Sequence, residues 1–403
     1  MQNVVVIGAG QAGASLVAKL RALEFTGKIT LIGEESAPPY QRPPLSKAYL
    51  LGDMALERLY LRPESFYAEN GIDLRLSDTA VSIDRTDKVV IAGGEAIPYD
   101  MLALTTGSVP RRLPGSIGGE LGGVHVVRTL ADVDAMAPGC KEGRRVLIVG
   151  GGYIGLEAAA VCAKLGLKVT LVEMAPRILQ RVACAETADY FRSLHSEHGV
   201  DLREGVGLTR LTGDTHVTGA ELDDGSTLDV DMVIVGVGIT PTTALAEATG
   251  LTIDNGIAVD AFGRTSDPTI WAAGDCASFP LDAGRIRLES VPNAIDQAEC
   301  VAGNMLGAGK EYVPQPWFWS DQYDVKLQIA GLNSGYDKVV VRPGDKPGSQ
   351  SVWYFAGDRL LAVDAMNDPR AYMVGKRLID AGKTASPDAV ADTAIELKAL
   401  MKA

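Results

Sequence analysis

The chain has 403 residues, enough to bury the cores of two or three domains, and 46 % of them are hydrophobic, as in a globular α/β protein. Its net charge of −13 argues against nucleic acid as a partner. The longest apolar runs have the length of strands, and the first strand follows directly on Met1-Gln2, so we expect a cytoplasmic protein without a membrane segment.

The first predicted element is a strand that begins at Val4 and runs into a glycine-rich turn and then a helical apolar pattern. The turn has the spacing Gly8-x-Gly10-x-x-Gly13, which lets backbone approach a pyrophosphate at a helix N-terminus. The next strand, 29–32, delivers Glu34 to the position of a ribose-binding acid. A glycine turn without a ligand is the alternative, but the strand–turn–helix context favours a dinucleotide site.

A proline-rich stretch follows, which reads PPYQRPPLSK from position 38. The prolines exclude a helix before Leu45, so Arg42 is expected in a constrained turn and Lys47 in the first turn of the next helix. This basic pair could neutralise a phosphate, and solvated charges on a surface turn are the equal alternative. Residues 72–104 alternate like a small antiparallel meander, with strands expected at 72–76, 80–84, 88–91 and 101–104.

The opening pattern then repeats. A strand at 146–149 runs into GGGYIG, a helix is expected over 156–165, and a second strand at 169–172 ends in Glu173. The motif residues are Gly150, Gly152, Tyr153, Ile154 and Gly155. Two dinucleotide folds in one chain predict a flavin in one and a nicotinamide in the other, because such a pair can exchange a hydride.

The second acid bears on the choice of coenzyme. The Glu173 carboxylate would accept hydrogen bonds from the adenosine 2′-OH and repel a 2′-phosphate, so NADH is expected to be preferred over NADPH. Arg177 and Arg181 follow closely and could partly offset that repulsion. A strand at 232–235 runs into a further glycine turn, and its Gly238 is also assigned to the NAD site.

From Tyr312 onward the composition changes, and three of the four tryptophans lie here. Alternating strands at 326–330, 339–342, 351–355 and 360–364 predict an antiparallel sheet, closed by helices at about 368–380 and 387–401. The five cysteines form no CxxC pair and no metal-ligand spacing with the four histidines. We therefore expect no metal site, and isolated buried thiols.

These motifs together resemble the FAD-dependent, NADH-utilising ferredoxin reductases with a glutathione-reductase-like fold. The specific marks are PPLSKAYL (43–50), GGGYIGLE (150–157), AAGDCA (272–277), ESVPNA (289–294) and PWFWSDQ (316–322). The resemblance implies an α/β fold with two Rossmann-like dinucleotide-binding domains and a C-terminal α+β interface domain. It places FAD on 1–108 and 235–313, NADH on 109–234, and the interface domain on 315–403.

The resemblance also implies roles for single residues. Ala12 and Glu34 would hold the adenosine half of a non-covalent FAD, Asp275 the ribityl chain, and Trp319 would lie near the isoalloxazine. With the glycine patterns, the FAD site comprises Gly8, Gly10, Ala12, Gly13, Glu34, Arg42, Lys47, Val81, Arg128, Asp275 and Val291. The family usually has Asn after the proline of its Gly-x-Gly-x-x-Pro segment, where this chain has Thr242.

Two charged residues are expected to act together beside the flavin. Lys47 comes from the flavin part of the chain and Glu157 from the NAD part, so we expect them to meet across the domain junction. The ammonium would favour an anionic reduced flavin, and the carboxylate would orient the ammonium. The alternative for Glu157 is a first-turn acid stabilised by the helix dipole, worth about 0.3–1 kcal/mol.

The expected function is that of an NADH:ferredoxin reductase. Hydride passes from NADH to the flavin, and single electrons pass to a [2Fe–2S] ferredoxin that serves a cytochrome P450 or a ring-hydroxylating dioxygenase. Disulfide reductases need a cysteine where this chain has Leu45-Ser46-Lys47. A redox sensor resembling apoptosis-inducing factor and a rubredoxin reductase stay open as alternatives. The acidic polar face of 387–401 argues against a membrane quinone reductase.

The charge of the chain is unevenly placed. Residues 315–403 carry 11 basic and 11 acidic side chains, so the whole negative excess lies upstream. Ferredoxins of this kind are acidic, as the resemblance implies, and docking on an acidic reductase then requires local basic groups. We expect them among Lys326, Lys338, Arg342, Lys376, Arg377 and Lys383, with Arg285 and Arg287 before them.

Overall fold

The computed structural model describes residues 2–281 and 284–402. The chain forms two compact units. The first unit comprises Met1–Arg42, Ala55–Val109 and Ile239–Gln315, and the second comprises Pro43–Met54, Pro110–Gly238 and Pro316–Ala403. Each unit contains a five-stranded parallel sheet that carries one of the two glycine turns.

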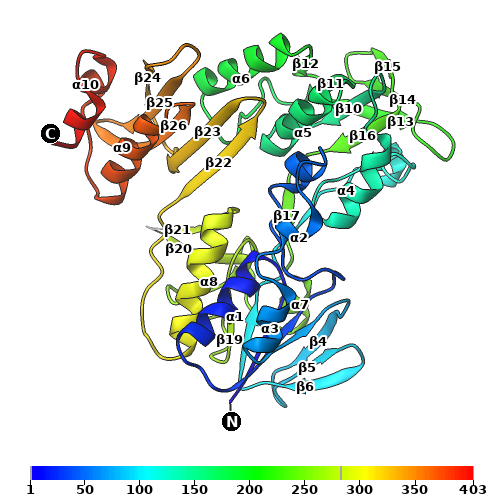
Figure 1. Ribbon diagram of the computed structural model, residues 1–403, viewed down its shortest axis with the longest axis vertical. Helices are drawn as coiled ribbons and strands as arrows, with labels where there is room; N and C mark the ends of the chain where they lie inside the picture. The colour runs from blue at the N-terminus through cyan, green and yellow to red at the C-terminus, as the bar shows by residue number, and fades with distance from the viewer. Residues whose placement is uncertain (1, 282–283, 403) are drawn as a thin grey trace. The chain divides into compact units, whose positions relative to one another are not determined.

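The parallel sheet of the first unit has the strand order β19-β7-β1-β2-β3. Its strands are β1 (Asn3–Ile7), β2 (Lys28–Ile32), β3 (Ile72–Arg75), β7 (Met101–Leu104) and β19 (Ile270–Ala272). Helices α1 (Gln11–Ala22) and α8 (Val291–Met305) lie side by side on one face, as Figure 1 shows, and pack on Val4 and Val6. A parallel sheet is covered on both faces, which explains the unbroken apolar run of β1.

The other face of this sheet is covered by a small antiparallel sheet formed by β4 (Ala80–Asp84), β5 (Val89–Ala92) and β6 (Glu95–Pro98). The meander expected over 72–104 is therefore wrong at both ends, because β3 and β7 belong to the parallel sheet. Alternation of apolar residues identifies a strand but not the direction of its neighbour.

The smaller elements along these segments connect the sheets. They are α2 (Leu56–Leu59), α3 (Glu64–Glu69), β8 (Ser108–Pro110), β17 (Ile239–Pro241), α7 (Ala244–Ala248), β18 (Ile257–Ala258), β20 (Ala277–Leu281) and β21 (Gly284–Ile286). The apolar side chains of α7, β18 and β20 join the core on the β4–β6 side of the parallel sheet. The first unit thus places its glycine turn at the carboxyl end of β1, between two packed layers.

The parallel sheet of the second unit has the order β12-β11-β10-β16-β9. Its strands are β9 (Val124–His125), β10 (Arg145–Val149), β11 (Lys168–Glu173), β12 (Asp201–Glu204) and β16 (Met232–Val235). Helices α5 (Tyr153–Lys164) and α6 (Ala185–Glu197) cover one face through Leu156 and Phe191. The hairpin strands β13 (Leu208–Thr212), β14 (Gly219–Leu222) and β15 (Thr227–Asp229) cover the other. Helix α4 (Leu130–Met136) precedes β10.

A second, antiparallel sheet belongs to the same unit, in the order β22-β23-β26-β25-β24. Its strands are β22 (Trp317–Gln322), β23 (Val325–Gly331), β24 (Lys338–Pro343), β25 (Gln350–Ala356) and β26 (Arg359–Met366). One face packs on α9 (Pro369–Asp380) through Val363 and Leu378. The other joins the core of α5 and α6 through Leu327 and Tyr354. Strand β22 has no counterpart among the strands expected from the sequence.

The helix expected over 387–401 is wrong, since the chain forms α10 (Pro387–Ala391) and a separate 3-10 segment η4 (Leu397–Lys402). Arg342 explains the break. Its buried guanidinium donates hydrogen bonds to the carbonyl oxygens of Val390 (2.8 Å), Asp392 (3.0 Å) and Ile395 (2.7 Å). A continuous helix would use these carbonyl groups internally.

Candidate functional site

The first glycine turn is shaped by close backbone approaches. A Cβ on Gly8, whose φ is +112°, would lie 2.2 Å from the carbonyl oxygen of Thr105, and one on Gly13 would lie 2.1 Å from that of Gly8. Gly10, the N-cap of α1, has open space in front of it and no side-chain cap. The first N–H groups of α1 are therefore directed at the space outside the turn, the arrangement that binds phosphate.

The acid after β2 lies next to a second one. Glu34 is exposed, while the neighbouring Glu35 accepts hydrogen bonds from the Tyr40 hydroxyl and from Nη2 of Arg42, both at 2.6 Å. The Arg42 guanidinium also lies 5.2 Å from the centre of the Tyr40 ring. The turn at 38–44 is thus fixed on Glu35, a role for Glu35 and Tyr40 that the sequence pattern did not indicate.

Asp275 lies close to the first glycine turn. It follows Gly274, where a Cβ would lie 3.0 Å from that of Ala12 on α1, and its carboxylate accepts from Ser108 Oγ at 2.8 Å. Val291 is the first residue of α8. Val81 is 66 % exposed, and the β4–β5 register shifts between Ala80 and Ser82, so Val81 is the extra residue of a bulge. The first unit therefore gathers Gly8, Gly10, Ala12, Gly13 and Asp275 and sets Val81 on a separate strand.

The second glycine turn repeats the geometry of the first. A Cβ on Gly150 (φ +110°) would lie 2.4 Å from the carbonyl oxygen of Gly236, and one on Gly155 would lie 2.0 Å from that of Gly150. Gly152 is the N-cap of α5, again with open space and no side-chain cap. Tyr153 and Ile154 begin the helix, and Ile154 is 45 % exposed. The same phosphate-binding backbone is present twice.

Glu173, at the end of β11, closes this second turn. Its Oε2 accepts from the Gly151 N–H at 2.7 Å and its Oε1 from the Ala175 N–H at 2.8 Å, which fixes the carboxylate beside the glycine loop. Arg177 is engaged in a different way, because it donates to the carbonyl oxygens of Ala183 (2.8 Å) and Cys184 (3.2 Å). Its guanidinium is therefore committed to the backbone, whereas Arg181 is exposed.

Gly238 ends the segment that touches the second glycine turn. Its φ is +101°, and the carbonyl oxygen of Gly236, two residues earlier, lies against the turn at Gly150. The carboxyl ends of β10 and β16 thus meet beside the α5 N-terminus. This is where an open parallel sheet binds its ligand.

Lys47 and Glu157 form a buried ion pair. Lys47 Nζ lies 2.9 Å from Glu157 Oε1, and the two side chains are only 17 % and 6 % exposed. Lys47 sits in η1 (Leu45–Tyr49), a π-type turn, with non-helical angles (φ −126°, ψ −108°) rather than in the regular first turn expected. The contact itself is the expected one. Both residues belong to the second unit, because Pro43–Met54 is part of it although the chain on either side of this segment belongs to the first.

The environment of Glu157 sets its ionisation. Burial raises the pKa of the Glu157 carboxyl, while the Lys47 ammonium and a hydrogen bond from Ser320 oppose that rise. Ser320 Oγ donates to Glu157 Oε1 at 2.7 Å from strand β22. Ser320 is a site residue that sequence reasoning missed, although it lies inside the PWFWSDQ run that carried the resemblance.

The other two residues assigned to the flavin also belong to the second unit. Trp319 is next to Ser320 on β22, with its ring centre 5.6 Å from that of Trp317, and it points to the opposite face of the strand. Arg128 directly precedes Thr129, the N-cap of α4, and its N–H donates to Asp132. Lys47, Glu157 and Trp319 are therefore carried by the same unit as the second glycine turn.

The expected docking groups divide into two sets. Arg342, Arg285 and Arg287 donate to backbone carbonyl groups, so the expectation that these three are available for docking is wrong. Lys376 pairs with Asp380 at 2.6 Å on the surface of α9. Lys326, Lys338, Arg377 and Lys383 are exposed. The sequence alone does not distinguish basic side chains that form hydrogen bonds within the fold from those that remain exposed.

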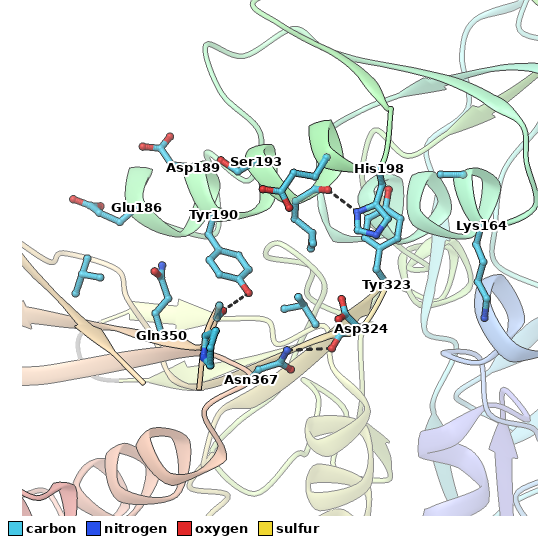
Figure 2. A pocket seen from close by; sticks show the side chains of 17 residues that line it. Lys164, Glu186, Asp189, Tyr190, Ser193, His198, Tyr323, Asp324, Gln350 and Asn367 are labelled. Carbon is cyan, nitrogen blue, oxygen red and sulfur yellow. Dashed lines mark hydrogen bonds between the residues drawn. The ribbon is translucent and has the colours of Figure 1, made fainter. Parts of the chain in front are cut away.

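A groove of about 1010 Å³ lies between α6 and the C-terminal sheet (Figure 2). Glu186, Asp189, Tyr190 and His198 line it from α6 and the residue after it, and Tyr323 and Asp324 from the turn after β22. The Tyr190 hydroxyl donates to the Gly348 carbonyl oxygen at 2.7 Å. Figure 2 shows Tyr323 lying against His198. None of the residues assigned to FAD or NAD lines this groove.

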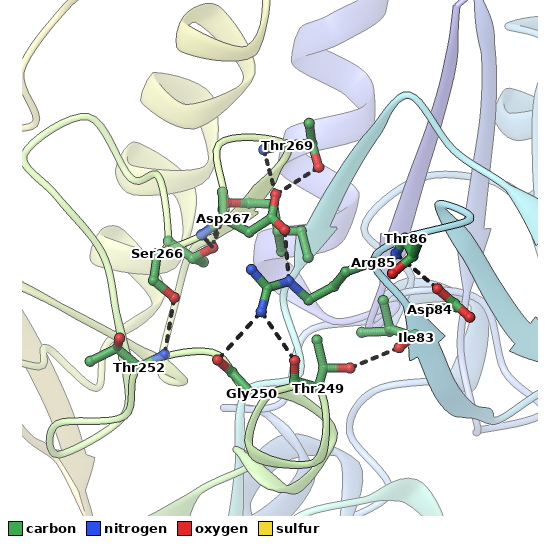
Figure 3. Close-up of polar contacts among 12 residues, drawn as sticks. Ile83, Asp84, Arg85, Thr86, Thr249, Gly250, Thr252, Ser266, Asp267 and Thr269 are labelled. Carbon is green, nitrogen blue, oxygen red and sulfur yellow. Dashed lines mark hydrogen bonds and ion pairs between the residues drawn. The ribbon is translucent and has the colours of Figure 1, made fainter.

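A hollow of about 690 Å³ lies in the first unit beside β4. Arg85 Nε donates to Asp267 Oδ2 at 2.7 Å and its Nη1 faces the carbonyl oxygen of Thr249 at 3.4 Å, which joins β4 to α7. Figure 3 shows these contacts converging on the guanidinium. The Arg85 contacts are structural, and no residue assigned to FAD lines the hollow.

Residues 2–281 and 284–402 contain neither a metal cluster nor a membrane-spanning helix. No group of three or more His, Cys, Asp or Glu side chains there could hold a metal ion. Within the same ranges, no helix has the length and apolarity to cross a bilayer.

The chain matches the family model described as pyridine nucleotide-disulphide oxidoreductase over residues 2–298, and the one described as reductase C-terminal over 317–401. Rhodocoxin reductase of Rhodococcus erythropolis is 42 % identical over 400 residues, 98 % of this chain and 93 % of that protein. A ferredoxin–NAD(P)(+) reductase of a Sphingomonas species is 43 % identical over 391 residues, 96 % of this chain and 94 % of that protein.

Among solved structures, the covalent putidaredoxin reductase–putidaredoxin complex matches with a TM-score of 0.95 and 39 % identity, over 100 % of this chain and 98 % of that one. These similarities confirm the fold class and the resemblance to ferredoxin reductases that the sequence motifs indicated. With two glycine turns of matching geometry and this coverage, the chain belongs to the pyridine nucleotide-disulphide oxidoreductase family and carries its reductase C-terminal domain.

Proposed function

We propose that this protein is a cytoplasmic NADH-dependent flavoprotein that reduces a [2Fe–2S] ferredoxin, which in turn serves a cytochrome P450 or a ring-hydroxylating dioxygenase. The observation that carries the proposal is the pair of uncapped helix N-termini behind glycine turns, together with the buried Lys47–Glu157 pair in place of a redox cysteine. The relatives named above are reductases of small electron carriers, which supports the same acceptor class.

The first glycine turn fits the phosphates of FAD. The open space at Gly10 and the uncapped N-terminus of α1 suit a pyrophosphate, the exposed Glu34 suits a ribose, and Asp275 lies beside Ala12 for the ribityl chain. The bulge at Val81 leaves backbone groups unpaired that can meet the adenine edge. Lys47, Arg128 and Trp319 stay predicted flavin contacts. When bound, FAD supplies the chemistry that side chains lack, since it accepts a hydride and gives up electrons singly.

The second glycine turn fits NADH. The α5 N-terminus takes the pyrophosphate, and the Glu173 carboxylate, already held by two backbone N–H groups, keeps acceptor capacity for the ribose hydroxyls. Arg177 is committed to carbonyl groups, which removes one of the two cations that could have offset repulsion of a 2′-phosphate. The preference for NADH therefore rests on Glu173.

The side chains of this protein bind and orient the cofactor and the coenzyme. The proposed reaction requires none of them as a nucleophile. Segment 45–47 reads Leu-Ser-Lys, so it offers no thiol for disulfide exchange. The Lys47 ammonium, held by Glu157, provides a fixed positive charge for a reduced, anionic acceptor. The exposed cations Lys338 and Arg377 of the C-terminal sheet and helix are candidate docking groups for an acidic carrier.

The test uses the purified protein and NADH to reduce a panel of electron carriers. The visible spectra of the carriers report their reduction. We expect about one FAD per chain, released by heat or acid, and rapid reduction of a [2Fe–2S] ferredoxin. Ferricyanide, which needs no docking, is the control. Rapid reduction of a rubredoxin with no ferredoxin activity would identify a rubredoxin reductase instead. Reduction of ferricyanide alone, with slow turnover on every carrier, would support a redox sensor, and release of FMN would overturn the cofactor assignment.

A further inference from the structure

A continuous chain of hydrogen bonds runs from the groove in Figure 2 to the Lys47–Glu157 pair. Tyr323 OH lies 3.2 Å from His195 Nδ1, and His195 Nε2 lies 2.8 Å from Gln322 Oε1. Gln322 Nε2 then donates to Ser320 Oγ at 3.1 Å, and Ser320 Oγ donates to Glu157 Oε1 at 2.7 Å. All of these residues belong to the second unit.

Each link of this chain has one direction. The ionised Glu157 carboxylate only accepts, so the Ser320 hydroxyl donates to it and must accept from the Gln322 amide. The amide oxygen of Gln322 then accepts from His195 Nε2–H, which leaves Nδ1 to accept from the Tyr323 hydroxyl. Every donor therefore points toward Glu157, and successive bonds in such a series polarise one another.

Four residues of this hydrogen-bond series are buried, so water cannot replace the bonds between them. Ser320, Gln322 and His195 are fully buried and Glu157 is 5 % exposed. Burial lowers the pKa of His195 to about 4, so the imidazole is neutral and carries a single N–H at physiological pH. The charged groups that act on Glu157 are Lys47 from η1, which favours its ionisation, and Asp321 from β22, which opposes it. Burial of an ionised carboxylate costs free energy, so the ionised form of Glu157 depends on the hydrogen bonds that it accepts.

The outer end of the chain lies at the groove between α6 and the C-terminal sheet. The Tyr323 ring is stacked on His198 at 3.6 Å between ring centres, and both line the groove. Figure 2 shows the two rings together at the end of α6. Strand β22 thus connects Glu157 on α5 with His195 on α6 through Ser320 and Gln322, two residues of one strand face.

We propose that Ser320, Gln322, His195 and Tyr323 are positioning residues that keep Glu157 ionised and thereby hold the Lys47 ammonium in place. The chain acts by orientation, since an amide in its middle passes no proton in its ordinary form. Its effect on hydride transfer rests on the proposed function. The ionisation of Glu157 does not, and it can be measured without NADH or ferredoxin.

The test is a pH titration of Glu157 by infrared difference spectroscopy, in which the spectrum of Glu157→Gln is subtracted and the C=O stretch of the protonated carboxyl is followed. Ser320→Ala removes the last donor, and we expect the ionisation constant of Glu157 to fall at least tenfold. Ser320→Thr keeps the hydroxyl, so we expect the ionisation constant of Glu157 to stay close to that of the unmodified protein. Gln322→Leu is expected to match Ser320→Ala in direction, and His195→Phe and Tyr323→Phe to have successively smaller effects.

Tyr190→Phe is the matched control, because Tyr190 lines the same groove from α6 but donates to the Gly348 carbonyl oxygen. A titration of Glu157 in Ser320→Ala or Gln322→Leu that equals that of Tyr190→Phe would overturn the proposal. If His195→Phe does not fold, Gln322→Leu is sufficient to test the proposal. Altered titration with unaltered ferredoxin reduction would support the positioning role and separate it from the proposed function.

Discussion

Lys47 Nζ and Glu157 Oε1 lie 2.9 Å apart inside one compact unit, and Glu157 has almost no contact with solvent. The lysine is brought there by the π-type turn η1, in which Lys47 itself has non-helical backbone angles. Such turns recur at functional sites because they displace one side chain from the helical path. The pair therefore depends on a local backbone irregularity as well as on opposite charge.

Lys47→Ala is expected to slow the reduction of bound flavin by NADH about tenfold or more. The ammonium contributes a charge-assisted hydrogen bond of about 1.5–3 kcal/mol, and without it the buried Glu157 carboxyl takes up a proton more readily. Stopped-flow absorbance of the flavin gives the rate. Lys47→Arg keeps the charge and is the control. An unchanged rate in Lys47→Ala would return both residues to a structural role.

Glu173→Gln is expected to narrow the gap in kcat/KM between NADH and NADPH by about tenfold, which corresponds to about 1.4 kcal/mol. The substitution removes the charge that repels a 2′-phosphate and keeps one oxygen to accept from the Gly151 or Ala175 N–H. Arg181→Ala tests the remaining nearby cation and is expected to lower activity with NADPH only. Equal kcat/KM for the two coenzymes in the unmodified protein would contradict the assignment of Glu173.

Asp364→Asn is expected to stabilise the protein above pH 6. Asp364 is buried on β26, accepts from Thr187 Oγ1 at 2.8 Å and from the Tyr354 hydroxyl, and burial raises its pKa to about 6. A raised pKa means that the protonated form favours the fold, so its contribution is complete below the unfolded value near 4 and is lost as pH rises through 6. The largest gain is about 3 kcal/mol, from about 1.4 kcal/mol per pKa unit.

Urea unfolding at pH 4 and pH 8 measures this effect. The two proteins should unfold alike at pH 4 and differ at pH 8. Asp324→Asn, at an exposed position in the groove, is the control and should change little at either pH. A loss of stability in Asp364→Asn at pH 8 would show that the ionised carboxylate is needed by Thr187 and Tyr354.

Charge reversal at Lys338 or Arg377 is expected to raise the apparent KM for ferredoxin and leave ferricyanide reduction unchanged. Both side chains are exposed, and steering by exposed charges weakens with salt because the Debye length falls from about 10 Å at 0.1 M to about 3 Å at 1 M. Lys383→Glu extends the series. Ferredoxin reduction that is constant between about 0.05 M and 0.5 M salt, with all three reversals silent, would favour recognition by packing around Trp317 and Trp319.

Arg342→Met tests whether Arg342 holds the C-terminal segment by hydrogen bonds rather than serving as a docking group. Loss of three buried hydrogen bonds to Val390, Asp392 and Ile395 is expected to lower the free energy of unfolding by about 1.5–4.5 kcal/mol, at about 0.5–1.5 kcal/mol for each bond. Thermal or urea unfolding measures the loss. Arg377→Met, on the exposed side of α9, is the control. Full stability in Arg342→Met, with a raised KM for ferredoxin, would restore Arg342 as a docking group.

The parts of the fold that follow from local rules were predictable from the sequence. Gly8 and Gly150 are needed where the chain approaches a neighbouring carbonyl oxygen, and that need is written in the motif itself. The strand expected at 146–149 and the helix after Asp368 follow from periodicity. The direction of β3 and β7 in their sheet did not follow, because parallel and antiparallel partners impose the same alternation.

The contacts between segments that are distant in the chain could not be predicted from the sequence. Ser320 and Glu157 are 163 residues apart and His195 and Gln322 are 127 apart, and no spacing rule joins such pairs. The motif PWFWSDQ indicated that this stretch matters, but only the pleat of β22 separates Trp319 from Ser320 and Gln322. The helix expected over 387–401 failed for the same reason, because Arg342 competes for its carbonyl groups from another strand.

Arg342 binds carbonyl oxygens, so it holds the last part of the chain by the path of its backbone rather than by the identity of its side chains. The side chains of Thr393 and Ala394 are exposed, and we expect their replacement to leave all three bonds in place. Removal of one residue between 390 and 395 would instead shift a carbonyl out of reach and leave a buried N–H group without an acceptor. We therefore expect the fold to depend more on the length of this segment than on the identity of Thr393 and Ala394.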